Sequence, residues 1–282
     1  MTSKTRDPRA VLREAGLVPK RSFGQSFLVA PDVARRIAEA AVPDVEVGSA
    51  TVVEIGAGTG ALTCQLAERA KHVVAIERDR DLVPILRASL PENVEVVEAD
   101  AKAHDYGRGI VLAGNLPYQL TGPLLERAVA SEGLVRAVFM VQDEVADRLL
   151  ARPGTKQYGA LTVFVRAAFD VGRLLRVGAA SFYPRPEVTS AVVVLTPRRD
   201  RIEETERFRA LVHAAFAKRR KTLRNAWRGL GPDDVIEEAA RRAGISLDAR
   251  GETLSVEQFA AMDRRWTELS GDGTSRPSLR AP

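Results

Sequence analysis

The segment TVVEIGAGTGALTCQLAERA, residues 51–70, decides the fold class of this 282-residue chain. Its first five residues are mostly apolar and β-branched, which is typical of a buried strand. Three glycines follow at alternate positions, and a helical pattern begins at Ala61. A strand, a glycine-rich turn and a helix in this order form the first unit of a doubly wound parallel sheet, in which the turn lies against a ligand.

Strands and helices continue to alternate after this unit. We expect strands over 73–76, 94–97, 110–113 and 137–141, and helices over 81–90 and 121–130. The apolar runs at 161–169 and 188–195 lack long helical crossovers, so we expect them to add an antiparallel edge. The predicted fold class is therefore α/β and Rossmann-like, with a mostly parallel sheet.

After Pro197 the apolar residues recur at helical spacing. Between Arg198 and Arg228 eleven Lys or Arg residues face only four Asp or Glu residues, which favours a surface that binds a polyanion. The sequence thus predicts a basic flexible segment over 1–20, a catalytic domain over 21–197, a small all-helical domain over 198–270 and a disordered tail over 271–282.

Composition excludes several classes of protein. No run approaches the roughly 20 apolar residues of a membrane span, and the first 20 residues carry no hydrophobic signal core. Cys64 is the single cysteine, which rules out an internal disulfide framework, and the three histidines have no metal-ligand spacing. We expect a cytoplasmic protein with no membrane association and no metal.

Two acids follow neighbouring strands of the predicted sheet. Glu77 ends the second strand, 21 positions after Gly56, and Asp100 follows the third. A carboxylate at the first place can accept hydrogen bonds from two ribose hydroxyls, and one at the second can bind an adenine amino group. Each acid alone is also consistent with a helix cap or a solvated strand end. Together they favour a nucleoside cofactor at the carboxyl edge of the sheet.

The tetrapeptide Asn115-Leu116-Pro117-Tyr118 follows the fourth strand and decides the chemistry. The amino group of adenine is a poor nucleophile, because its lone pair is delocalised into the ring. The Asn115 amide oxygen and the Leu116 carbonyl can accept its two hydrogens, so that the nitrogen becomes more tetrahedral as it attacks. Pro117 fixes the backbone, and Tyr118 offers a ring on which an extruded base can stack.

These motifs together resemble the ribosomal RNA adenine N6-dimethyltransferases, and most closely the bacterial small-subunit (16S) branch. The similarity extends from about Arg21 to Leu269. It includes RSFGQSFL at 21–28, similar to the amino-terminal cofactor motif of the family, and SFYPRPEVTS at 181–190, similar to its proline-rich loop. The run FAKRRKTLRN at 216–225 is similar to the signature of the small-subunit branch.

The resemblance implies an S-adenosylmethionine-dependent methyltransferase that acts on two adjacent adenosines near the 3′ end of 16S rRNA. It implies a monomeric enzyme whose partner is 16S rRNA within an immature small ribosomal subunit. It also implies that Phe182 helps to enclose the target base beside the catalytic tetrapeptide. The cofactor contacts that it implies are Gln25, Ser26, Leu28, Gly56, Gly58, Glu77, Asp100 and Asn115. We expect phosphate contacts from Lys218, Arg219, Arg220, Lys221, Arg224 and Arg228.

Three alternatives stay open at this point. The glycine loop also satisfies a loose dinucleotide fingerprint, which would suit an oxidoreductase. The same catalytic domain occurs in methyltransferases that act on large-subunit (23S) rRNA and confer antibiotic resistance. A ribosome-assembly factor with a vestigial site is the third, although the presence of Glu77, Asp100, Asn115 and Tyr118 argues against it.

Overall fold

The computed structural model describes residues 6–218 and 220–271. The chain divides into two compact units: the first comprises residues 1–150 and 169–199, and the second residues 151–168 and 200–282. The division after residue 199 lies close to the expected boundary after residue 197. Residues 151–168 belong with the helical unit, whereas the sequence assigned them to the catalytic domain. The first five residues of the predicted basic segment, Arg219 and the predicted tail after Gly271 lie outside the described residues.

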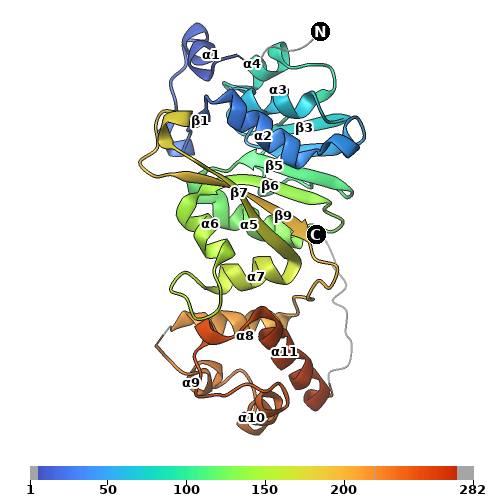
Figure 1. The fold of residues 1–282 in the computed structure, drawn as a ribbon, viewed down its shortest axis with the longest axis vertical. Helices are drawn as coiled ribbons and strands as arrows, with labels where there is room; N and C mark the ends of the chain where they lie inside the picture. The colour runs from blue at the N-terminus through green and yellow to red at the C-terminus, as the bar shows by residue number, and fades with distance from the viewer. Residues whose placement is uncertain (1–5, 219, 272–282) are drawn as a thin grey trace. The chain divides into compact units, whose positions relative to one another are not determined.

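Among the described residues, seven strands form the main sheet of the first unit, in the order β4-β3-β2-β5-β6-β9-β7 (Figure 1). These strands are β2 (Thr51–Ile55), β3 (His72–Glu77), β4 (Val94–Glu98), β5 (Ile110–Asn115), β6 (Arg136–Gln142), β7 (Phe169–Val177) and β9 (Ser190–Pro197). The five strands from β4 to β6 are parallel, and β9 pairs antiparallel with both β6 and β7. The predicted fold class is confirmed.

The described part of the first unit also contains six helices. They are α1 (Pro8–Glu14), α2 (Pro31–Ala41), α3 (Ala61–Ala67), α4 (Val83–Ser89), α5 (Thr121–Ala130) and α6 (Asp143–Leu150). Ile37 of α2 and Leu66 of α3 are fully buried in one core with Val52 and Val111 of the sheet. Single-turn 3-10 helices of the two units cover Arg21–Phe23, Asp44–Glu46, Tyr118–Leu120, Ala179–Ser181 and Gly251–Thr253.

Residues 8–14 form the helix α1, although the sequence predicted a flexible segment over 1–20. Pro8 occupies the first turn of α1, and the Asp7 side chain caps this helix by accepting a hydrogen bond from the Arg9 backbone N–H at 2.8 Å. Leu12 is buried and packs with Phe27 and Leu82. This apolar contact fixes the segment to the first unit.

The predicted edge strand over 161–169 is wrong, because this run forms the helix α7 (Ala160–Ala168). Val163, Phe164 and Ala167 lie on one side of α7 and are buried in the core of the helical unit. A short run of β-branched and aromatic residues fits a strand and a buried helix equally well by pattern alone. The antiparallel edge exists, but β7 follows this run and β9 covers most of the second one.

The second unit is helical, as predicted. Beside α7 it contains α8 (Glu206–Ala217), α9 (Leu223–Trp227), α10 (Asp233–Arg242) and α11 (Val256–Ser270). Phe208 and Leu211 of α8 are fully buried in its core with Trp227 and Phe259. The Trp227 indole N–H donates to the Leu211 carbonyl at 3.0 Å, which satisfies its buried polar atom.

Candidate active site

The glycine turn after β2 has the backbone conformation that the sequence suggests. Gly56, Gly58 and Gly60 have positive φ values of 76°, 60° and 84°. A Cβ atom on Gly58 would lie only 3.1 Å from the Phe27 ring, so both conformation and space require glycine there. The backbone N–H groups of Gly56 and Ala57 donate to the Ile76 carbonyl, which ties the turn to the end of β3.

Glu77 lies beside this turn at the end of β3 and is 6% exposed. Its Oε2 accepts from the Gly58 backbone N–H and its Oε1 from the Asp79 backbone N–H, both at 2.8 Å. Burial raises the pKa of Glu77 above its ordinary value, although these two hydrogen bonds act in the opposite direction. The Glu77 carboxylate lines the pocket, where it can accept a hydrogen bond from a ribose hydroxyl.

Asp100 lies just after β4, on the same edge of the sheet. Its Oδ1 accepts from the Lys102 backbone N–H at 2.9 Å, and its Oδ2 lies 3.6 Å from the Lys102 Nζ. The Asp100 side chain is 41% exposed, so it can still accept from a ligand. Glu77 and Asp100 both line one pocket with the glycine turn.

Asn115 ends β5, and its side-chain Nδ2 donates to the backbone carbonyl of Ser26 at 2.8 Å. This bond fixes which end of the amide faces the pocket, because the nitrogen is engaged and Oδ1 stays available as an acceptor. The next residue is also fixed, since the Leu116 N–H donates to the Met140 carbonyl at 3.0 Å. Asn115 and Leu116 are therefore rigidly placed at the pocket.

Tyr118 is half-buried, and its hydroxyl lies 2.9 Å from the Oγ of Ser190, the fully buried first residue of β9. Burial raises the pKa of the Tyr118 phenol. The Pro117 carbonyl accepts from the Thr121 hydroxyl at 3.2 Å, at the start of α5. Both Pro117 and Tyr118 line the pocket, and two contacts from other elements hold the tetrapeptide.

The amino-terminal cofactor motif also reaches the pocket. Phe27 and Leu28 form β1, which pairs antiparallel with Phe182 and Tyr183 of β8. The Ser26 Oγ donates to the Pro184 carbonyl at 2.9 Å, in addition to the contact of its own carbonyl with Asn115. The residues of this motif that line the pocket include Gln25, Ser26 and Leu28.

The structure does not bring Phe182 to the pocket. Its side chain is 1% exposed and belongs to the sheet core with Leu28 and Val192. The next residue, Tyr183, is 39% exposed and lies near Arg9, whose guanidinium carbon is 5.9 Å from the ring centroid. Of the two aromatic residues of β8, Tyr183 is therefore the exposed one.

Two acids that the sequence did not single out belong to this region. Glu54 of β2 lines the pocket and is 1% exposed, and its Oε2 has no hydrogen-bond partner among the described residues. Burial, with the nearby charge of Glu77, raises the pKa of Glu54 to about 7, although the Thr63 hydroxyl lowers it. Asp79 is 2% exposed and lies behind Glu77. The strand and turn patterns in the sequence did not predict that the side chains of Glu54 and Asp79 would be buried.

Comparison with known proteins decides the family. The sequence model described as "Ribosomal RNA adenine dimethylase" matches residues 17–267. This protein belongs to the ribosomal RNA adenine dimethylase family. It is 45% identical to the "Ribosomal RNA small subunit methyltransferase A" of Moorella thermoacetica, over 90% of this chain and 95% of that protein. The protein of the same name from Myxococcus xanthus is 40% identical, over 96% and 99% of the two chains.

Solved structures agree with this assignment to the ribosomal RNA adenine dimethylase family. A dimethyladenosine transferase from Plasmodium falciparum is 25% identical, with a TM-score of 0.78 over 86% of this chain and 98% of that one. The 23S rRNA methyltransferase ErmE is 27% identical, with a TM-score of 0.64 over 85% and 99% of the two chains. The protein is thus an rRNA adenine dimethyltransferase that uses S-adenosylmethionine, and the oxidoreductase alternative is excluded.

The pocket of this ribosomal RNA adenine dimethylase fits that cofactor. The turn at Gly56 and Gly58 leaves room for a ligand against the backbone, and acids follow β3 and β4 where ribose and adenine would lie. Within the described residues, no group of three or more His, Cys, Asp or Glu side chains is arranged to hold a metal ion. No helix in that part of the chain is long and apolar enough to cross a membrane.

The predicted phosphate contacts lie in the helical unit of this ribosomal RNA adenine dimethylase. Those that the structure describes are exposed: Lys218, Arg220, Lys221, Arg224 and Arg228. They lie between the end of α8 and the end of α9. The Arg224 guanidinium forms an ion pair with Glu237 at 2.5 Å, so part of its charge is already neutralised.

Proposed function

We propose that this protein transfers methyl groups from S-adenosylmethionine to N6 of two adjacent adenosines near the 3′ end of small-subunit rRNA, two to each base. The observation that carries the chemistry is the orientation of Asn115, whose Nδ2 donates to Ser26 and whose Oδ1 stays available. The choice of the small subunit is supported by relatives of that name at 40% to 45% identity, each covering at least 90% of this chain.

Asn115 and Leu116 would act on the nucleophile. The amide oxygen of Asn115 and the carbonyl of Leu116 accept the two amino hydrogens of adenine, and this raises electron density on N6 as it attacks. Their rigid placement matters because the gain comes from orientation and preorganised dipoles. The cofactor, when bound, supplies a methyl group already activated by its positively charged sulfonium.

Tyr118 would hold the extruded base. Stacking on its ring contributes about 1–3 kcal/mol and tolerates a base that already carries one methyl group. The hydroxyl contact with Ser190 fixes the plane of the ring. A second methyl transfer can then use the same site, provided that the pocket admits the monomethylated base.

The basic residues of the helical unit would bind phosphates of the folded RNA. Such contacts give affinity that falls with salt and carry little sequence information. Specificity would then come from the shape of the RNA and from the flipped base. We further propose that the enzyme acts as a monomer in the cytoplasm on an immature small ribosomal subunit.

Two alternatives differ from this proposal, one in the RNA substrate and one in having no methyl transfer at all. The likeness to a 23S rRNA methyltransferase keeps a large-subunit substrate possible, while the basic run at 216–225 resembles the small-subunit branch. A separate role as an assembly factor would need only RNA binding. A large-subunit enzyme would methylate a different RNA. An assembly factor would methylate none.

The test is transfer of labelled methyl to undermethylated small subunits and, in parallel, to large-subunit rRNA, followed by nucleoside analysis. Asn115→Ala removes the proposed acceptor. Gln119→Ala is the matched control, because it removes an exposed amide four residues away that does not line the pocket.

We expect dimethyladenosine in small-subunit rRNA from the wild type and Gln119→Ala, and about a hundredfold slower transfer from Asn115→Ala. Label in large-subunit rRNA alone would overturn the substrate. Retained RNA binding without any transfer would favour the assembly role.

A further inference from the structure

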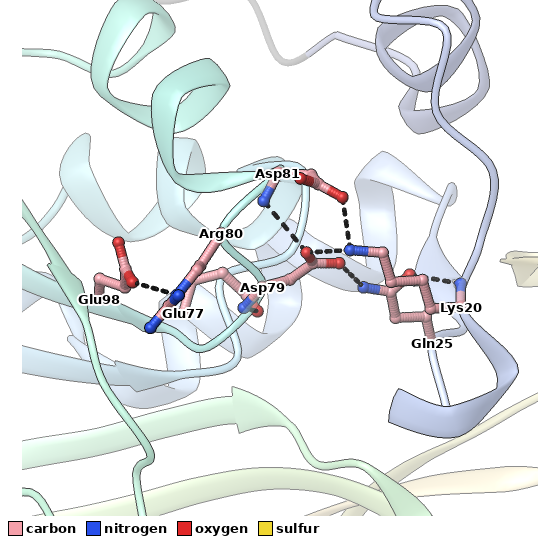
Figure 2. Close-up of polar contacts among 7 residues, drawn as sticks. All are labelled: Lys20, Gln25, Glu77, Asp79, Arg80, Asp81 and Glu98. Carbon is pink, nitrogen blue, oxygen red and sulfur yellow. Dashed lines mark hydrogen bonds and ion pairs between the residues drawn. The ribbon is translucent and has the colours of Figure 1, made fainter.

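Asp79 is a buried carboxylate that no part of the proposed chemistry uses. It lies two residues after Glu77 and does not line the cofactor pocket. Figure 2 shows Lys20 and Gln25 pointing toward it from the amino-terminal segment, more than 50 positions away in the sequence. A buried carboxylate is destabilising without hydrogen-bond or ion-pair partners, and Lys20 and Gln25 supply them here.

The Asp79 carboxylate accepts three hydrogen bonds within the protein. Its Oδ1 accepts from the Lys20 Nζ at 2.5 Å and from the Asp81 backbone N–H at 3.1 Å. Its Oδ2 accepts from the Gln25 Nε2 at 2.6 Å. Burial raises the pKa of Asp79, but the hydrogen bonds from Lys20, Gln25 and the Asp81 backbone, together with the charge of Lys20, lower it overall, so the carboxylate is charged at neutral pH.

Gln25 uses both ends of its side-chain amide for contacts within the protein. The Oε1 accepts from the Lys20 backbone N–H at 2.8 Å, while the Nε2 donates to Asp79. Gln25 therefore closes a loop between Lys20 and itself, and Asp79 holds that loop at two points. This arrangement favours a role in shaping the segment over a direct contact with the cofactor.

The segment that Asp79 holds is a wall of the cofactor pocket. Residues 23–28 line the pocket, and the Ser26 carbonyl accepts the hydrogen bond that orients Asn115. On its other side, the Asp79 backbone N–H holds Glu77 Oε1. One residue thus connects the ribose-binding acid with the wall that orients the catalytic amide.

We propose that Asp79 is a positioning residue for methyl transfer, whose carboxylate fastens residues 20–28 over the cofactor pocket through Lys20 and Gln25. The inference rests on the proposed function, because that proposal gives Asn115 its catalytic role. The expected effect of Asp79 on cofactor binding does not depend on which RNA is the substrate. We call these contacts of Asp79 with Lys20 and Gln25 the Asp79 latch, and Gln25 is a second positioning residue in it.

The latch can be removed without removing the fold. Leu12, Phe27 and Leu82 pack together and hold the same segment through apolar contacts. Asp79→Asn keeps the shape of the side chain while it removes the charge. Asp81→Asn is the matched control, because Asp81 Oδ2 contacts the same Lys20 Nζ at 2.6 Å but its side chain is 53% exposed.

The experiment measures the dissociation constant of S-adenosylmethionine by calorimetry and the amide exchange of residues 20–28. Single-turnover transfer at saturating cofactor is the third readout. For Asp79→Asn we expect cofactor binding about 10-fold to 100-fold weaker, faster exchange in residues 20–28 alone, and a slower single-turnover rate. Asp81→Asn should change binding less than about twofold. Lys20→Met should resemble Asp79→Asn, and Lys20→Arg should retain most of the affinity.

Three results would overturn the inference. Unchanged cofactor affinity in both Asp79→Asn and Lys20→Met would show that these contacts do not affect cofactor binding. Equal losses in Asp79→Asn and Asp81→Asn would point to general charge effects. Faster exchange throughout β2 to β5 would make Asp79 a stability residue only. A wild-type enzyme that binds the cofactor but methylates no rRNA would refute the proposed function and leave this test intact.

Discussion

Replacing Glu54 with glutamine should make the stability of the first unit less dependent on pH. Burial raises the pKa of Glu54 from 4.5 to about 7 in the folded protein. Each pKa unit corresponds to about 1.4 kcal/mol, so ionising this side chain costs about 3 kcal/mol of folding free energy. Because the pKa of this carboxyl is raised on folding, protonated Glu54 contributes to the free energy of unfolding. That contribution is complete below pH 4.5 and is lost as pH rises through 7. About 2 kcal/mol of it falls between pH 5.5 and pH 8.5.

Urea unfolding at these two pH values, followed by circular dichroism, measures the effect. The loss of unfolding free energy on going from pH 5.5 to pH 8.5 should be about 2 kcal/mol smaller in Glu54→Gln than in the wild type. Trp227 and Trp266 both belong to the helical unit, so their fluorescence reports that unit separately. Glu98→Gln is the control, because it removes an exposed carboxylate of β4 whose ion pair with Arg80 lies at the surface. Identical pH dependence in Glu54→Gln and the wild type would refute the reasoning.

Three further predictions concern Gly114 in the central strand β5, the Tyr118 ring and the basic residues of the helical unit. Gly114→Ala should destabilise the first unit by about 1–3 kcal/mol in urea unfolding, because its Cβ would lie 2.5 Å from the Ile55 carbonyl oxygen. The control is Gly172→Ala in β7, whose Cβ would meet no atom within 4 Å and which should be nearly neutral. Tyr118→Phe should slow methyl transfer only a few-fold and Tyr118→Ala about 10-fold to 100-fold, since the ring supplies the stacking; equal losses would assign the effect to the hydroxyl. Lys221→Ala and Arg228→Ala should each reduce the slope of log affinity for rRNA against log salt by about one, and an unchanged slope in a binding titration would remove these residues from the interface.

The sequence predicted the parts of the site that lie at strand ends. Glu77, Asp100 and Asn115 follow consecutive parallel strands, so the topology alone places them on one edge of the sheet. It did not predict Asp79, because a carboxylate two residues beyond a strand has no pattern that marks it as buried. The register that turns Phe182 into the core and leaves Tyr183 exposed is likewise set by pairing with β1, which is distant in sequence.

The misassigned run at 161–169 has the same cause. Val163 and Phe164 suit a strand by propensity, and only the partners Phe208 and Trp227 of the helical unit give them a helical core to fill. Local sequence therefore predicts which chemical groups reach the edge of the sheet. Contacts between distant segments decide which of these groups are buried, exposed or held in place.

The same division applies to catalysis by this site. The sheet supplies the carboxyl ends of β2, β3 and β5, yet the orientation of Asn115 depends on the Ser26 carbonyl, 89 positions earlier in the chain. Ser26 in turn contacts Pro184, so one short segment touches both the Asn115 amide, for which we propose the catalytic role, and the loop after β8. Methyl transfer requires little of the protein beyond placing two reactants, so small displacements of this segment should cost rate even when every group at the strand ends is intact. We therefore expect loss of a positioning contact outside the sheet to slow the reaction as much as loss of a residue proposed to touch the cofactor or the base.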